Sequence, residues 1–337
     1  MNTHDLARLA SLFKAIPLPE FSFASDQSEG SEDNPGLQAY WRHYGFDTLL
    51  KRHRVRYHIG RAHMHDYQLV CHYWRPPRPL AHVVVVHGLF DHVGLYLKLV
   101  DALLCAGYAV VAVDLPGHGL SEGEATAIPS FNDYSGCLAE LLTRLRAHDH
   151  LPVFAVGQST GGAVIANHVL SSEAKEDRIV SAIVLLSPLI YPRKWHLVRC
   201  SYCLLSPFLQ RIKRNFTAPS HDADFCRFLA TEDPLQSRYL SVSWVRAMMQ
   251  WIHTFASLPV SSLPALIIQG DRDMTVDASR NVPLYKSKLL AANALTIAGA
   301  GHQLVNELQS VREQVFSSML EFLSSQRLSV HTTKDIY

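Results

Sequence analysis

Short apolar runs alternate with segments of helical spacing over most of the chain. The runs are nearly continuous and rich in β-branched residues, which is typical of strands buried on both faces of a sheet; they lie at residues 81–86, 108–113, 153–156, 179–186, 265–269 and 294–297. Helical spacing predicts helices over residues 94–106, 134–147, 163–170 and 311–323. Two more strand-like segments, 54–60 and 67–74, predict an antiparallel hairpin at one edge. The alternation predicts an α/β fold with a mostly parallel sheet.

One long insertion interrupts this alternation. Between residues 191 and 258 helical spacing takes over, as in Val245, Met248 and Ile252. A segment of this size between two core strands predicts a helical cap over a pocket. Near the start of the chain, a helical segment ends at Pro17, and the polar stretch Ser22 to Gly36 predicts a loose linker. The predicted divisions are an N-terminal extension and linker (1–50), an α/β core (51–190 and 259–326), a helical cap or lid (191–258) and a C-terminal tail (327–337).

The candidate chemistry begins where a buried strand meets a helix. Residues 153–156 lead into Gly157-Gln158-Ser159-Thr160-Gly161, and an apolar helical segment follows. A G-x-S-x-G turn in this strand–turn–helix context presents its serine as a nucleophile, and the glycines allow the tight turn to close. The helix N-terminus directs free N–H groups to the place where negative charge would develop. The alternative is an ordinary Gly/Ser turn before a buried helix, but the flanking elements favour a nucleophile.

Composition and charge narrow the function classes. The formal net charge of the 337 residues is +1, so no global field favours nucleic acid, and no basic–aromatic motif indicates it. The six cysteines are scattered, and the Cys200/Cys203 pair lacks the second pair or His motif that a zinc site needs. We therefore expect no metal, no cofactor and no obligate protein partner. Without a signal-peptide core or a run long enough to span a membrane, the expected compartment is the cytoplasm.

Several further motifs occur in a recognisable order between residues 55 and 325. Together with the serine turn, they are His87-Gly88, Asp114 followed by Gly117-His118-Gly119-Leu120-Ser121, Ser187-Pro188-Leu189, Asp233-Pro234-Leu235, Gly270-Asp271-Arg272-Asp273 and Gly301-His302. With them the chain resembles the α/β-hydrolase superfamily, and within it the serine hydrolases that include monoacylglycerol lipases and bacterial lysophospholipases. The sequence departs from many of these relatives at Leu115-Pro116, where they have an arginine, and in the loop Leu89-Phe90-Asp91-His92. Both departures bear on substrate more than on chemistry.

A catalytic triad follows from general chemistry together with this resemblance. A serine hydroxyl needs a base to take its proton, and a histidine held by a carboxylate serves at neutral pH. The chain order of the fold is serine, acid, histidine, which assigns Ser159 as nucleophile and His302, after a glycine-rich loop, as base. Asp271 and Asp273 compete as the acid; the G-x-x-D spacing of the family, counted from Gly270, favours Asp273. The expected oxyanion hole is formed by the backbone N–H groups of Leu89 and Thr160, with His87 bracing the loop.

The substrate is the least readable part of the sequence. An apolar patch in the cap, from Leu197 to Leu209, suits an acyl chain but also suits core packing. Basic residues of the cap favour a phosphate headgroup or an anionic membrane surface, unless they form only a solvated face; they are Arg199, Arg211, Lys213 and Arg214. The resemblance implies hydrolysis of a small lipid ester, monoacylglycerol or lysophospholipid, with the cap as a candidate for peripheral membrane contact.

Three other functions stay open at this point. A generic short-chain carboxylesterase would use the same residues on a different ester. An aminopeptidase on the same scaffold would need an acidic pocket for the substrate amine, and four acids of the cap keep it in play: Asp222, Asp224, Glu232 and Asp233. A non-catalytic binding protein on this scaffold is disfavoured, because all three triad positions are occupied.

Overall fold

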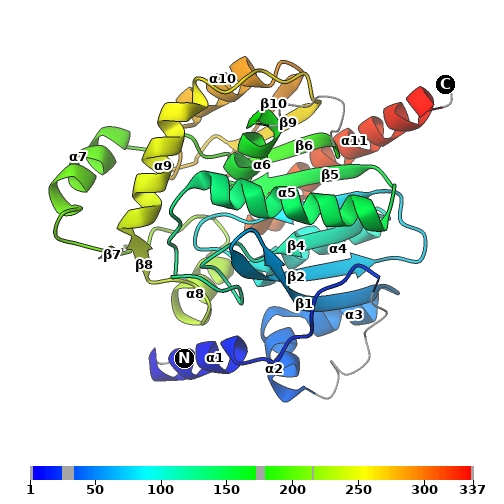
Figure 1. Ribbon diagram of the computed structural model, residues 1–337, viewed down its shortest axis with the longest axis horizontal. Coiled ribbons are helices and arrows are strands. Elements are labelled where there is room, and N and C mark those ends of the chain that lie inside the picture. The colour runs from blue at the N-terminus through cyan, green and yellow to red at the C-terminus, as the bar shows by residue number, and fades with distance from the viewer. Residues whose placement is uncertain (1–2, 25–33, 172–178, 215, 335–337) are drawn as a thin grey trace.

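Eight strands form the central sheet of the computed structural model (Figure 1), which describes residues 3–24, 34–171, 179–214 and 216–334. Their order across the sheet is β1-β2-β4-β3-β5-β6-β9-β10. Only β2 runs antiparallel to its neighbours β1 and β4, and the remaining pairs are parallel. The predicted α/β fold with an antiparallel hairpin at one edge is therefore confirmed. The strands are β1 (Arg56–Met64), β2 (Tyr67–Arg75), β3 (His82–Val86), β4 (Ala109–Val113), β5 (Val153–Gln158), β6 (Val180–Leu186), β9 (Ala265–Gly270) and β10 (Ala292–Ile297).

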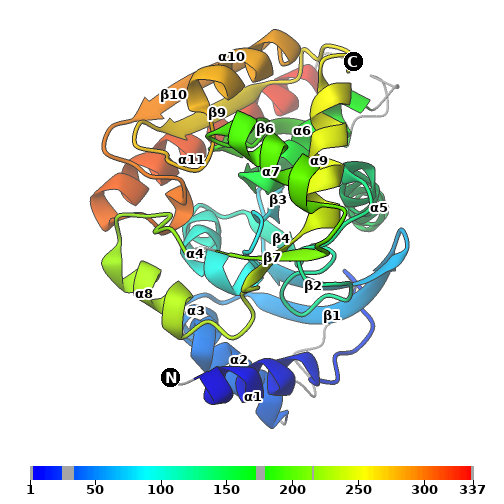
Figure 2. The same ribbon diagram turned by 90° about the vertical axis from the view of Figure 1, so that its left-hand side faces the viewer.

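Helices cover both faces of the sheet, with α5 (Phe131–His148) and α9 (Val242–Phe255) on one side of the strands and α4 (Leu97–Cys105) on the other (Figure 2). This explains the continuous apolar runs of the central strands. Alternate residues of β3 enter two different cores: Val84 and Val86 face one, and Val83 and Val85 face the other. The first core contains side chains of α5, α6 (Thr160–Ser171) and α10 (Ala278–Lys288). The second contains side chains of α4, which follows the short helix η1 (Val93–Tyr96), and of α11 (Gln309–Lys334), which follows η2 (Leu304–Asn306).

The first fifty residues pack against the rest of the protein more closely than the predicted extension and linker would. Three helices, α1 (Thr3–Lys14), α2 (Pro35–Tyr44) and α3 (Phe46–Arg52), bury Phe13, Tyr40 and Phe46 in the second core. The predicted linker reached Gly36, but α2 already begins at Pro35, because the Asn34 side chain accepts the Leu37 N–H and proline suits the first helical position. Residues 25–33 of that linker lie outside the described residues.

The segment after β6 carries the predicted helices and one element that the prediction missed. It contains α7 (Trp195–Leu205), α8 (Ala223–Thr231) and α9 (Val242–Phe255), and also a two-stranded antiparallel ribbon of β7 (Arg211–Lys213) and β8 (Tyr239–Ser241). Strands of three residues are too short to establish a period-two pattern, so helical spacing dominated the prediction. Figure 1 places α7, the ribbon and α8 to one side of the sheet, with α7 farthest from it.

The C-terminal end differs from the prediction as well. Helix α11 continues through the expected tail as far as Lys334 and projects on the side opposite α7 (Figure 1). Within the described part of the chain, no helix combines the length and the apolar character that crossing a bilayer requires.

Candidate active site

Ser159 occupies a strained turn between β5 and α6. Its φ of 53° lies in the left-handed region, which non-glycine residues rarely adopt. The surrounding backbone holds it there: the Ser159 N–H donates to the Leu186 carbonyl at 2.8 Å, and the Ser159 carbonyl accepts the Leu189 N–H at 3.1 Å. A Cβ on Gly161 would overlap the Val86 carbonyl oxygen of β3, so only glycine lets α6 approach the sheet this closely.

The structure brings the three predicted triad side chains together from separate loops. The Ser159 Oγ lies 2.9 Å from the His302 Nε2, and the His302 Nδ1 lies 2.8 Å from the Asp273 Oδ2. The serine follows β5, the aspartate follows β9 and the histidine follows β10. Because parallel strands have their carboxyl ends at one edge of the sheet, these loops meet there. The exposed fractions of Ser159, Asp273 and His302 are only 8%, 4% and 8%, so the group is shielded from bulk water.

The environment of Asp273 keeps its carboxylate charged. Burial by itself would raise the pKa of Asp273, but the His302 ring and the backbone N–H groups of Thr275 and Val276 outweigh it and hold that pKa below its ordinary value. Asp271, the competing acid, is exposed and accepts the Gly299 N–H at 2.7 Å. Asp271 therefore ties together the loops that follow β9 and β10, and the carboxylate beside His302 is that of Asp273.

Leu89 and Thr160 line the same cavity as Ser159. Among the described residues, no protein acceptor takes the backbone N–H of either one. The loop that carries Leu89 is braced by His87, whose Nδ1 lies 2.8 Å from the Gly88 carbonyl and whose Nε2 accepts the Leu115 N–H at 2.9 Å. Burial lowers the pKa of His87 well below its usual value, so the ring is neutral and both nitrogens hold backbone. His87 thus does what the sequence analysis expects of it.

A cavity of about 430 Å³ opens above Ser159 and has linings of two kinds. Part of its apolar lining comes from α9 and nearby elements that pack in the first core, including Leu189, Val198, Leu240, Trp244, Val245 and Met248. Ile212 of β7 and Leu229 of α8 also line it. Its polar groups are Asp91 and Gln303, which follow β3 and β10, and Lys213 and Arg214 at the end of β7. The neighbours of this polar part, η1, η2 and α8, pack in the second core, on the opposite face of the sheet. Ser159 lies between the two linings.

Sequence reasoning did not identify the polar group next to the triad. The buried Asp91 accepts hydrogen bonds at its Oδ2 from the Tyr96 hydroxyl and from the Gln303 amide, both at 2.8 Å. Burial raises the pKa of Asp91. The Arg214 guanidinium lies 4.0 Å above the Phe90 ring. Two signals in the sequence pointed to this region: the departure of loop 89–92 from the family pattern, and the basic residues Lys213 and Arg214. Neither indicated that Asp91 and Gln303 bond to each other.

The four acids of the cap that kept an aminopeptidase in play lie outside the lining of this cavity. Asp222 and Asp224 line a different cavity beside Lys98, and Glu232 pairs with Arg227 at 3.8 Å. Asp233 is fully buried, accepts the Tyr44 hydroxyl at 2.7 Å and lies 3.2 Å from the His92 Nε2. The Asp233-Pro234-Leu235 motif thus anchors the cap to the core.

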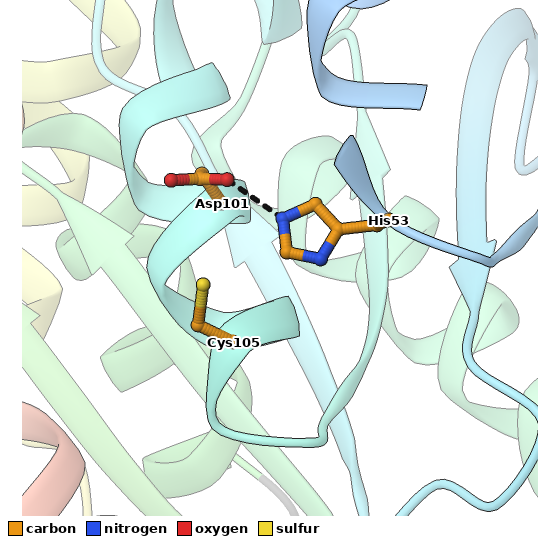
Figure 3. A group of neighbouring side chains, drawn as sticks. All are labelled: His53, Asp101 and Cys105. Atoms are coloured by element: carbon orange, nitrogen blue, oxygen red, sulfur yellow. Dashed lines mark hydrogen bonds and ion pairs between the residues drawn. The ribbon is translucent and has the colours of Figure 1, made fainter. Parts of the chain in front are cut away.

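One other cluster has residue types that could bind a metal ion (Figure 3). Ligand atoms of His53, Asp101 and Cys105 lie within 4.8 Å of one another, the last two on successive turns of α4. The His53 Nε2 already contacts one Asp101 oxygen at 2.7 Å, and the Arg52 guanidinium contacts the other at 2.7 Å. A cation would have to compete with that arginine, so the cluster is explained as a surface ion pair. Cys200 and Cys203, the other pair considered in the sequence, are exposed on α7.

Comparisons with known proteins agree with this architecture. The model of the Hydrolase_4 family, described as serine aminopeptidase, S33, matches residues 77–309. Phospholipase YtpA of Bacillus subtilis (strain 168) is 29% identical over 265 residues, which cover 74% of this chain and 97% of the relative. Human monoglyceride lipase is 28% identical over 275 residues, covering 78% of this chain and 89% of the relative.

Solved structures show the same fold. A soluble variant of monoglyceride lipase from Saccharomyces cerevisiae, in complex with a substrate analog, superposes with a TM-score of 0.68 at 19% identity, covering 79% of this chain and 94% of that one. The monoacylglycerol lipase of Paleococcus ferrophilus gives a TM-score of 0.65 at 23% identity, covering 77% and 99%. The resemblance noted in the motifs is confirmed: the chain belongs to the Hydrolase_4 (serine aminopeptidase, S33) family of the α/β-hydrolase superfamily.

Proposed function

We propose that Ser159, His302 and Asp273 form a catalytic triad that hydrolyses the ester of a monoacyl lipid, either a monoacylglycerol or a lysophospholipid. The family, with lipases and a phospholipase among its relatives, makes the protein a carboxylic ester hydrolase. The observation that carries the triad is the continuous contact from the Ser159 Oγ through the His302 ring to the Asp273 carboxylate, at 2.9 and 2.8 Å. In this proposal residues 191–258 act as the cap over the site.

The mechanism uses each group in turn. The Ser159 Oγ attacks the ester carbonyl carbon while the His302 Nε2 takes the serine proton. The ionised Asp273 holds the Nδ1–H and stabilises the imidazolium, and the N–H groups of Leu89 and Thr160 donate to the oxyanion. His302 then gives its proton to the leaving alcohol oxygen as the acyl C–O bond breaks. Water then attacks the acyl carbon while His302 takes its proton, and the histidine returns that proton to the Ser159 Oγ as the acyl–Oγ bond breaks and the fatty acid leaves.

The lining of the cavity supports a lipid substrate. Trp244, Val245 and Met248 of α9 offer an apolar surface next to Ser159, which suits an acyl chain. The named relatives, phospholipase YtpA and monoglyceride lipase, both have names that describe lipid ester hydrolysis. The charged residues among the described lining are Asp91, Lys213 and Arg214, apart from His302. Because two of these three are cations, they oppose the α-amine of an aminopeptidase substrate, despite the description of the family.

Hydrolysis by the purified protein across three substrate groups tests this function. We expect rates on p-nitrophenyl esters to rise with acyl length, turnover of a monoacylglycerol or a lysophospholipid, and no release from an aminoacyl arylamide. A preference for the shortest esters would replace the lipase by a generic short-chain carboxylesterase. Turnover of the arylamide alone would make the protein a peptidase.

We also propose that the cap contacts a lipid surface through α7 and the loop after it. Leu197, Leu204 and Phe208 are 62%, 72% and 82% exposed. A group of large apolar side chains this exposed to water is unusual, and it is typical of a surface that another surface covers. Helix α7 contains no acidic residue, and the exposed Lys194 and Arg199 lie at its start and middle. Apolar side chains flanked by cations are typical of contact with an anionic lipid surface.

The double variant Leu204→Ser with Phe208→Ser tests this contact. We expect it to lose most binding to vesicles of anionic phospholipid in a sedimentation assay, because two apolar anchors are removed. Its rate on a soluble short-chain ester should stay near that of the wild type. Leu290→Ser, which changes a 63% exposed leucine in the turn before β10, is the matched control and should bind vesicles normally. Unchanged vesicle binding by the double variant would refute the proposal.

A further inference from the structure

Arg214 is a half-buried cation in the lining of the cavity and forms no ion pair with a described carboxylate. It follows β7 directly, and its backbone N–H donates to the Arg238 carbonyl at 2.9 Å. Its Nη1 is buried and has no hydrogen-bond partner among the described residues, nor does any described carboxylate form an ion pair with Arg214. Burial lowers the pKa of Arg214 to about 10, which leaves it protonated at neutral pH. Asp91 and Asp233 attract this half-buried cation without forming an ion pair, so it is poorly compensated, and an anionic ligand in direct contact would lower its desolvation cost.

Aromatic rings hold this guanidinium in place. Its Cζ lies 4.0 Å from the centroid of the Phe90 ring and 5.6 Å from that of Phe216. Stacking on an aromatic face is favourable for arginine and leaves its N–H groups in the plane of the fork free to donate. Such a fork matches the oxygens of a phosphate, to which it donates two parallel hydrogen bonds.

Asp91, which follows Phe90 in the sequence, does not cancel the positive charge of Arg214. Asp91 lines the same cavity, but its Oδ2 is taken by the Tyr96 hydroxyl and the Gln303 amide. The Asp91 carboxylate attracts Arg214 without forming an ion pair with it, so it offsets the cation only in part. Lys213 lines the cavity too and adds a second cation. Arg214 and Lys213 therefore leave the polar lining with an excess of positive charge.

The position of Arg214 relative to the triad indicates which part of a substrate it meets. Phe90, on which it stacks, directly follows Leu89, the proposed oxyanion donor, and Gln303 directly follows His302, which protonates the leaving alcohol. The acyl chain has its apolar surface on α9, which packs in the other core. An ester bound across Ser159 with its acyl chain along α9 places its alcohol part beside Arg214.

We infer that Arg214 binds a phosphate carried by the alcohol part of the substrate, so that a lysophospholipid is preferred over a neutral monoacylglycerol. This inference rests on the proposed ester hydrolysis and narrows it to one substrate class. Arg214 acts by binding the headgroup. Its loss should therefore change the ratio of kcat/KM for phosphate-bearing and neutral substrates, and leave the chemistry at the ester carbonyl unchanged.

The test compares lysophosphatidic acid with a monoacylglycerol of the same acyl chain, both at low mole fraction in micelles of a neutral detergent so that surface charge stays small. We expect the wild type to have the higher kcat/KM on the phosphate ester. In Arg214→Gln the ratio of the two kcat/KM values should fall about 10- to 100-fold, the range for losing charge-assisted hydrogen bonds. Arg214→Lys, which keeps the charge but not the fork, should lose part of that ratio. Arg211→Gln, an exposed neighbour stacked 4.8 Å over Tyr239, is the matched control and should keep it.

Two further measurements separate the sources of failure. Inorganic phosphate should inhibit p-nitrophenyl ester hydrolysis by the wild type at lower concentration than it inhibits Arg214→Gln. Inhibition by phosphate without any preference for lysophosphatidic acid would mean that the site takes free phosphate, and it would overturn the headgroup assignment. An equal ratio in wild type and Arg214→Gln, with p-nitrophenyl esters still cleaved, would overturn this inference alone. A folded wild type that cleaves no ester would instead overturn the proposed function.

Discussion

Replacing Ser159 by alanine should lower kcat for p-nitrophenyl ester hydrolysis by up to about a million-fold, the loss observed when the nucleophile of a serine triad is removed. The reason is that no other hydroxyl can form the acyl enzyme: the Ser159 Oγ is the group that contacts the His302 Nε2, at 2.9 Å. The measurement is steady-state turnover together with covalent labelling by a fluorophosphonate probe, which should mark the wild type and not the variant.

Ser171→Ala is the control for this substitution. Ser171 ends the same helix, α6, and is exposed, so its loss should change neither turnover nor labelling. Thermal unfolding of both variants should follow that of the wild type closely, since neither hydroxyl supports the core. Full activity of Ser159→Ala would mean that the nucleophile lies elsewhere and that the strained turn has another purpose.

Asp273→Asn should lower kcat by about 10⁴-fold, as expected when a triad carboxylate becomes an amide. The asparagine oxygen can still accept the N–H groups of Thr275 and Val276, which hold the loop at 2.8 and 3.0 Å. Its NH₂ group would then face the His302 Nδ1 and donate to it. The histidine would have to carry its proton on Nε2, where it could no longer accept the proton of Ser159.

Asp271→Asn provides a matched control two residues away. Its amide oxygen can still accept the Gly299 N–H, so kcat should remain within about two-fold of the wild type and thermal stability should change little. Steady-state kinetics of the two variants, measured side by side, decide between the two acids of the Gly270–Asp273 motif. A large loss in Asp271→Asn with little loss in Asp273→Asn would reverse the assignment made here.

The core of the fold was predictable because its signals are local. Buried parallel strands require continuous apolar runs, and β3, β4 and β5 are such runs. The turn around Ser159 was visible because a strained backbone next to a closely packed helix leaves no room for side chains, and glycines mark those positions. The ribbon of β7 and β8 carries no comparable signal, since three residues show no period, and it was missed.

The first fifty residues illustrate a second limit. Helical spacing predicted a helix that ends at Pro17, but it did not show what that helix packs against. In the structure Phe13 packs on Tyr40, and Tyr40 and Phe46 pack on His72 of β2. Long-range packing of this kind depends on the shape of a surface that exists only after the core has formed. Local patterns cannot encode it.

By itself, the sequence determined the α/β class and the serine turn, because strand periodicity and a tight strand-to-helix turn are local signals. With the family resemblance, it also pointed to His302 and favoured Asp273 over Asp271 for the proposed triad. Only the tertiary structure shows the contacts behind that preference: Asp273 lies beside His302, whereas Asp271, two residues earlier, accepts the Gly299 N–H. It also decided that Arg214 of the cap stacks on Phe90 of the loop after β3, which no spacing along the chain reveals. Contacts between segments far apart in the chain arise from packing, and the polar part of the site is built from such contacts.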